Sequence, residues 1–145
     1  MKKKTIIVVS GTANIGKSMT LSRLGVQLYY AGASTNQKFP AKDYRACFQY
    51  KTKKIGIQTY GDTEHLVYTG LHELQSQNCD IIAIASKGFG KTVKAIETFA
   101  NSYNYRVIWS TPYRVWDGSV TTSDIKDYTA SHLKLMIDDV ISGIL

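Results

Sequence analysis

The sequence predicts an α/β protein of three layers, with a mostly parallel sheet, one antiparallel edge strand and helices on both faces. Short apolar runs at 5–10, 80–85 and 106–110 are typical of buried parallel strands. A segment with helical spacing follows each run, and such alternation produces a parallel sheet that is covered on both sides. The 145 residues are enough for one domain, which we expect to span 1–145.

The first helix follows the strand at 5–10, because Leu21, Leu24 and Leu28 recur on one face. Gly32 stands where a glycine commonly ends a helix. Two segments of alternating character come next, separated only by the letters KTK, and so short a connection requires an antiparallel hairpin. The hairpin strands are expected at 44–50 and 54–60, and the remaining helices at 64–77, at 91–103 and from Asp124 onward, with Ser123 as the N-cap of the last.

The composition allows anionic partners and gives no sign of a membrane segment. Lysine and arginine number 18 against 11 acidic residues, and the net charge of +7 suits nucleotides, nucleic acid or an acidic protein. The alternative is a solvated basic surface, because the charge is scattered and its only block is the run of lysines at 2–4. The apolar run at 6–9 is too short for a signal peptide, and no run approaches the ~20 residues that cross a bilayer. Cys47 and Cys79 match no metal or redox spacing, so we expect reduced thiols in a cytoplasmic protein.

The segment GTANIGKS, residues 11–18, joins the first strand to the first helix. Glycines let the backbone turn its N–H groups toward one point, and with the helix N-terminus these groups form an anion site. Lys17 would contact the outer phosphates of a nucleotide, and the Ser18 hydroxyl would bind Mg²⁺. The residues expected around the phosphates are Gly11, Thr12, Ala13, Asn14, Ile15, Gly16, Lys17, Ser18 and Met19.

In this strand–helix context the motif resembles the phosphate loop of the P-loop nucleoside triphosphatase superfamily, and the order of elements resembles that superfamily along the whole chain. The resemblance implies a three-layer P-loop fold, ATP or GTP as ligand with Mg²⁺, and cleavage or transfer of a phosphate bond. It also implies an acidic residue that holds Mg²⁺ through water at the end of a strand. Asp62 follows a strand at the edge where Lys17 lies, whereas Asp80 precedes its strand, so we expect Asp62 in this role. The alternative for Asp62 is a turn aspartate after Gly61.

Two further residues close to Asp62 are candidates for catalysis. Glu64 or His65 could orient or deprotonate an attacking water. Alternatively, they stand at an exposed helix N-terminus, where the charge of Glu64 is favourable in any case.

The hairpin before Asp62 is similar to the arrangement in Ras-like GTPases, where a loop ahead of it senses the γ-phosphate. Here that loop would be 33–43, and Ser34 or Thr35 could approach the metal. The chain departs from that family twice: GDTEH stands where GTPases carry Asp-x-x-Gly, and TPYR stands where they carry Asn-Lys-x-Asp. Guanine recognition of that type is unsupported, and we expect ATP.

A second segment, ASKGFGKT at 85–92, fits the phosphate-loop pattern if alanine takes the first place. It also resembles the lysine-rich loops of ParA-like partition ATPases, although Lys87 stands one residue too late and the loop follows a later strand. In P-loop folds the strand before it commonly lies beside the phosphate-loop strand, so both loops would leave one edge of the sheet. Lys87, Lys91 and Arg114 would then face the outer phosphates or a second anionic ligand. The alternative is a glycine turn with solvated lysines.

The leading interpretation is a small Mg²⁺-dependent NTPase that binds and hydrolyses ATP. Its candidate catalytic residues are Lys17, Glu64, His65 and Lys91. One alternative is a kinase that acts on a small molecule or a nucleotide. Another is a non-catalytic, nucleotide-dependent module whose basic surface meets nucleic acid or a protein.

Overall fold

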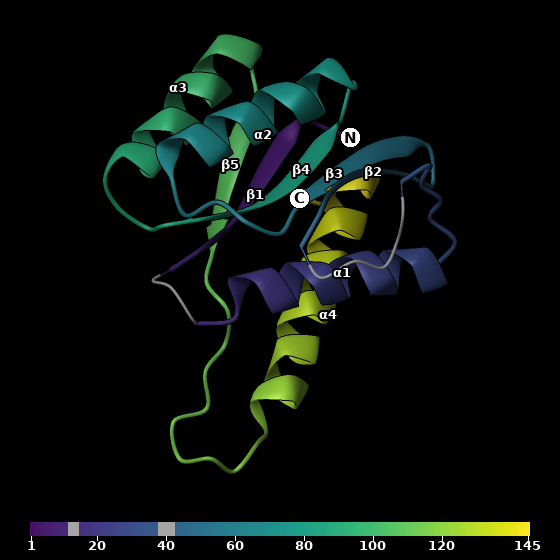
Figure 1. Ribbon diagram of the computed structural model, residues 1–145. Helices are drawn as coiled ribbons and strands as arrows, with labels where there is room; N and C mark the ends of the chain where they lie inside the picture. The colour runs from purple at the N-terminus through teal and green to yellow at the C-terminus, as the bar shows by residue number, and fades with distance from the viewer. Residues whose placement is uncertain (12–14, 38–42) are drawn as a thin grey trace.

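The computed structural model describes residues 1–11, 15–37 and 43–145, in which helices and strands alternate as the sequence predicts (Figure 1). The elements in chain order are β1 (Thr5–Ser10), α1 (Lys17–Tyr30), β2 (Arg45–Tyr50), β3 (Lys53–Gln58), α2 (Glu64–Ser76), β4 (Ile81–Ser86), α3 (Lys91–Tyr103), β5 (Arg106–Ser110) and α4 (Thr122–Ser142).

The described strands form one five-stranded sheet in the order β2-β3-β4-β1-β5. The strands β3, β4, β1 and β5 are parallel neighbours, whereas β2 runs antiparallel to β3 at the edge. This confirms the mostly parallel sheet and the antiparallel edge strand. The register pairs Thr5 with Ile81 and Ser10 with Ser86, so β4 lies directly beside β1 and both strands end at the same edge.

Helices cover both faces of the sheet, which confirms the three layers (Figure 1). The side chains of β1 alternate between the two cores. Ile7 and Val9 pack with α1 and α4, and Ile6 and Val8 pack with α2 and α3. All six residues of β1 are buried, as a strand between two parallel neighbours and two helical layers requires. Each fully buried isoleucine or valine contributes roughly 1.5–3 kcal/mol to folding.

The helix ends show one confirmed prediction and one wrong one. Gly32 has a φ of 103° just beyond α1, and its N–H bonds the Tyr29 carbonyl at 3.1 Å. The last helix begins at Thr122 rather than Asp124, and its N-cap is Thr121, whose hydroxyl accepts the Asp124 N–H at 3.0 Å. Ser123 is therefore not the N-cap; its hydroxyl accepts from the Arg23 guanidinium at 2.7 Å.

Asp138 on α4 fastens the β2–β3 turn to the helical layer. The Tyr50 hydroxyl and the Lys51 ammonium donate to its Oδ1 at 2.7 and 3.0 Å. The Lys134 ammonium donates to its Oδ2 at 3.0 Å. Burial alone would raise the pKa of Asp138, but these three hydrogen bonds outweigh burial and hold the pKa below its usual value.

None of the helices in the described part of the chain has both the length and the apolar character of a membrane-spanning helix.

Candidate functional site

The two glycine-containing loops meet at the edge of the sheet where the parallel strands end. The Gly11 N–H donates to the Ser86 carbonyl at 3.2 Å, which joins the first loop to the end of β4. In the second loop, a Cβ added at Gly88 would lie 3.8 Å from the Ser10 Cβ. This confirms the prediction that both loops leave the same edge. Thr12, Ala13 and Asn14 lie outside the described residues.

Lys17 is the centre of this site. Its side chain is almost fully buried, with 6% of the residue exposed. The ammonium donates to the carbonyls of Gly11 at 2.7 Å and Ser86 at 3.4 Å. It also lies 3.3 Å from Oδ1 of Asp62. A buried ammonium is tolerated only when oxygens surround it, and three oxygens do so here. The lysine therefore folds back over the start of its own loop, at the N-terminus of α1.

Asp62 reaches Lys17 by crossing the end of a strand. β3 is not adjacent to β1, because β4 lies between them. The chain leaves β3 and passes over β4 at Gly61, where an added Cβ would overlap the Ala85 carbonyl oxygen and lie 2.8 Å from its carbon. Glycine permits this close approach because it has no side chain. The carboxylate that follows is 61% exposed and open to solvent.

A second carboxylate, Asp43, holds the Ser18 hydroxyl. Ser18 Oγ donates to Asp43 Oδ1 at 2.6 Å. Thr59 Oγ1 donates to the same oxygen at 3.2 Å, and accepts the Tyr44 N–H at 3.0 Å. Sequence reasoning missed Asp43. The hairpin in the sequence could have indicated it. Because β2 runs antiparallel to β3, a residue just before β2, such as Asp43, lies at the edge where β3 ends.

The donor set at this edge suits a hard cation such as Mg²⁺. Ser18, Asp43, Thr59 and Asp62 offer hydroxyl and carboxylate oxygens, and protein magnesium sites combine one or two carboxylates with water and phosphate oxygens. No group of three or more His, Cys, Asp or Glu side chains in the described ranges could hold a metal ion by itself. A divalent ion here would thus take further ligands from water and a bound phosphate.

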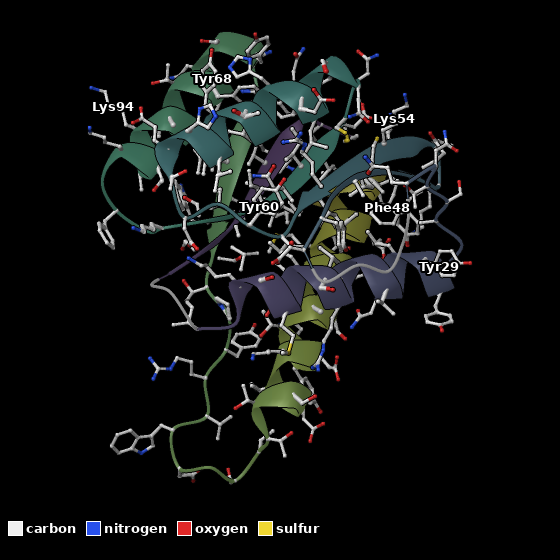
Figure 2. All side chains as sticks on the ribbon, in the orientation of Figure 1. Tyr29, Phe48, Lys54, Tyr60, Tyr68 and Lys94 are labelled. Carbon is white, nitrogen blue, oxygen red and sulfur yellow. The ribbon has the colours of Figure 1, made fainter. Side chains whose placement is uncertain are left out.

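A cavity of about 530 Å³ lies over these residues, and Tyr60, labelled in Figure 2, marks where β3 ends beside it. Gly16, Lys17, Ser18 and Met19 of the predicted phosphate site line this cavity. Lys126 of α4 lines it too. Its aliphatic chain lies against Gly16, where an added Cβ would be 3.2 Å from the Lys126 Cδ. Sequence reasoning missed Lys126, since nothing in the local pattern at 126 refers to a loop more than 100 residues earlier.

Lys126 also lines a second hollow, of about 430 Å³. Ile15 lines it from the first loop, and Arg114 lines it from the long segment between β5 and α4, which extends away from the sheet in Figure 1. The Tyr113 N–H donates to the Thr129 hydroxyl at 3.1 Å and fastens this segment to α4. Arg114 thus lines the second hollow and not the main cavity.

The second loop differs from the first in how its lysine lies. Lys91 is exposed at the start of α3, in contrast to the buried Lys17. The Thr92 hydroxyl lies within hydrogen-bond distance of the carbonyls of Lys87 and Phe89, 3.2 Å from each, and its one proton can be donated to either. Neither Lys87 nor Lys91 is among the residues that line the main cavity. Their contact with a phosphate or a second anion stays a prediction.

Glu64 and His65 are exposed in the first turn of α2. Thr63 caps this helix by accepting the Leu66 N–H at 3.2 Å. Glu64 lines a separate hollow between α2 and α3 and not the main cavity. The catalytic role suggested for these two residues stays a prediction.

The expectation that Ser34 or Thr35 approaches the metal is wrong. Ser34 exchanges two backbone hydrogen bonds with Gln49, at 3.0 and 2.8 Å. Antiparallel β2 carries Gln49 to the opposite edge of the sheet, where it pairs with Lys54 at the start of β3. Positions 38–42 of the same loop lie outside the described residues. At that opposite edge Asp80 accepts the Lys54 N–H at 2.9 Å, as its place before the strand predicts.

Comparison with known proteins finds no match, either among protein-family models or among curated proteins and solved structures.

Proposed function

We propose that this protein binds a nucleoside triphosphate, ATP in the first place, together with Mg²⁺ at the 11–18 loop, and hydrolyses it. The observation that carries the proposal is the position of Lys17. Its ammonium is buried against the Gly11 and Ser86 carbonyls, at the N-terminus of α1 and at the floor of an open cavity. A fixed positive charge at a helix N-terminus is suited to phosphate oxygens.

In this structure the Asp62 carboxylate neutralises the Lys17 ammonium, with 3.3 Å between Oδ1 and Nζ. Phosphate oxygens would take the place of this carboxylate beside the ammonium, and Asp62 would then be available to the water shell of the metal. Ser18 and Asp43 already share a hydrogen bond at 2.6 Å on the same side of the cavity. When bound, Mg²⁺ would neutralise charge on the phosphate oxygens.

Lys126 supplies a second cation to the same phosphates in this proposal. It has no hydrogen-bond or ion-pair partner in the part of the chain that the structure describes, and its stem crosses Gly16. A cation that faces transferring phosphate oxygens stabilises the charge they carry. In this proposal Lys126, which lines the main cavity, takes the role that the sequence interpretation gave to Lys87, Lys91 and Arg114.

A kinase is the second candidate, and the two hollows that share Lys126 in their linings favour it. A phosphotransferase needs one pocket for the nucleotide and another for the acceptor, and both hollows are large enough for a small molecule. Arg114 and Lys126 would suit an anionic acceptor in the second hollow.

The deciding experiment compares two lysines of the same motif position. ATP and ADP affinity with Mg²⁺ is measured by calorimetry for the wild type, Lys17→Ala and Lys91→Ala. We expect Lys17→Ala to lose about 2–5 kcal/mol of binding free energy, because a desolvated charged contact is removed. Lys91→Ala is the matched control and should leave ADP affinity nearly unchanged. Equal affinity of the wild type and a folded Lys17→Ala would refute the proposed site.

Turnover with γ-labelled ATP then separates the functions. Free labelled phosphate indicates hydrolysis. A labelled organic product formed only with added nucleosides or a metabolite extract indicates a kinase. Binding without either product indicates a nucleotide-dependent binding module.

A further inference from the structure

The two cysteines, distant in sequence, bring their sulfur atoms together across the sheet. Cys47 Sγ on β2 lies 3.4 Å from the Sγ of Cys79, which stands two residues before the start of β4. β3 runs between them, and the register places Gly56 directly opposite Cys47. A Cβ added at Gly56 would lie 2.9 Å from the Cys79 sulfur. The two thiols therefore meet over the single place on β3 where the absence of a side chain leaves room for them.

The two sulfurs have unequal surroundings. Cys79 is fully buried, whereas Cys47 is half-buried and lines a polar hollow of about 230 Å³ that Lys54 and Gln77 also line. Figure 2 shows sulfur atoms beside the labelled Lys54. An oxidant dissolved in water can thus reach Cys47 through this hollow, while Cys79 is covered by the core.

The hydrogen bond between the thiols makes the accessible Cys47 more acidic and the buried Cys79 less acidic. Donation by Cys79 lowers the pKa of Cys47 to about 7, with the charge of Lys54 acting in the same direction and burial and Asp80 opposing it. The same hydrogen bond, with burial, raises the pKa of Cys79 far above its usual value. The accessible sulfur is thus the more acidic of the two, and the buried one is the weaker acid.

We propose that Cys47 is a site of reversible two-electron oxidation by peroxides, and that Cys79 resolves the oxidised sulfur into an intramolecular disulfide. The observation that carries this is the sulfur–sulfur contact between one accessible and one buried thiol. It is independent of the nucleotide site, which lies at the opposite edge of the sheet.

Hydrogen peroxide is the only reactant that the two thiols need to form the disulfide. The Cys47 thiolate attacks one oxygen of hydrogen peroxide, the O–O bond breaks, and the leaving hydroxide takes a proton to become water. Cys47 is then a sulfenic acid and the peroxide has gained two electrons. The Cys79 sulfur displaces the hydroxyl of the sulfenic acid as a second water, with its thiol proton, and the S–S bond forms. A dithiol added as reductant reverses the change by exchange.

The test uses the full chain, reduced and freed of reductant, then treated with a small molar excess of hydrogen peroxide. We expect the intact mass to fall by two hydrogens and both thiols to lose reactivity toward maleimide. Proteolysis without reductant should give a peptide that links Cys47 to Cys79, and dithiothreitol should restore both thiols.

Two serine variants assign the roles, each with circular dichroism to verify the fold. Cys79→Ser should stop at the sulfenic acid, which dimedone captures as a single adduct on Cys47. Cys47→Ser should keep its Cys79 thiol unoxidised under the same treatment. The proposal is overturned if Cys79 oxidises as fast in Cys47→Ser as Cys47 does in Cys79→Ser. Two results with the wild-type protein would also overturn the proposal: disulfides between two chains, or sulfinic acid on Cys47, formed in place of the Cys47–Cys79 disulfide.

Discussion

Gly61→Ala tests whether the close passage of the chain over β4 positions Asp62. An alanine Cβ at this position would overlap the Ala85 carbonyl oxygen, would lie 2.8 Å from the carbonyl carbon and would approach a Val67 methyl at 3.3 Å. The Ala85 groups are backbone atoms of a central strand, so they cannot rotate away. The chain after β3 must instead lift from the end of β4.

The expected cost follows from that overlap. Inserting one methyl group into a packed site that forces the backbone to move costs typically about 1–3 kcal/mol of folding free energy. Lifting the turn also moves Asp62 away from Lys17, so an interaction at 3.3 Å is weakened in the same variant. We therefore expect lower stability together with a weaker effect of Mg²⁺ on ATP affinity.

Urea unfolding followed by circular dichroism measures the first effect, and calorimetry with and without Mg²⁺ measures the second. Gly88→Ala is the matched control at the same edge of the sheet. Its added Cβ would make only ordinary contacts, the nearest at 3.8 Å from Ser10 Cβ, so its stability should stay within about 0.5 kcal/mol of the wild type. If Gly61→Ala unfolds at the same urea concentration as Gly88→Ala, the steric reasoning is wrong.

The remaining predictions concern three charged residues. Asp43→Asn should keep the shape around Ser18 while lowering the gain in ATP affinity that Mg²⁺ brings; an unchanged gain in calorimetry would remove Asp43 from the metal site. Lys126→Ala should cost about 1.5–3 kcal/mol in the free energy of ATP binding or in the activation free energy of turnover, the range for hydrogen bonds to charged groups, and should leave the free energy of unfolding unchanged. If the variant binds and turns over ATP as the wild type does, Lys126 lies outside the phosphate site. Asp138 has a lowered pKa, so it stabilises the fold above the pKa it has when unfolded and loses this contribution as pH falls through the folded value. The stability advantage of the wild type over Asp138→Asn in urea unfolding should therefore shrink on acidification below about pH 4, and a constant difference from pH 7 to 3 would contradict this.

Much of the fold could be predicted because its signals are local. The apolar run at 5–10 indicates a strand with two covered faces, and the KTK connection leaves no choice but an antiparallel hairpin. Since parallel strands end at one edge, the place of the 11–18 loop, of Asp62 and of the 85–92 loop followed from chain order alone. The N-cap of α4 was missed because Thr121 and Ser123 are both good capping residues, and the contact of Ser123 with Arg23 of another helix is not visible locally.

Chain order in the sequence predicts that the two glycine-containing loops leave one edge of the sheet, and it gives the residue types available there. Which side chains meet at that edge depends on the tertiary structure. Lys17 and Lys91 both follow a glycine at the same place of the loop pattern, yet one is buried against two carbonyls and the other is exposed. Asp43 bonds Ser18, the Lys126 chain lies against Gly16, and Cys47 meets Cys79, all between segments distant in sequence. The physical reason is that backbone direction is a short-range property of the chain, whereas the partners of a side chain depend on packing between elements that are far apart in sequence.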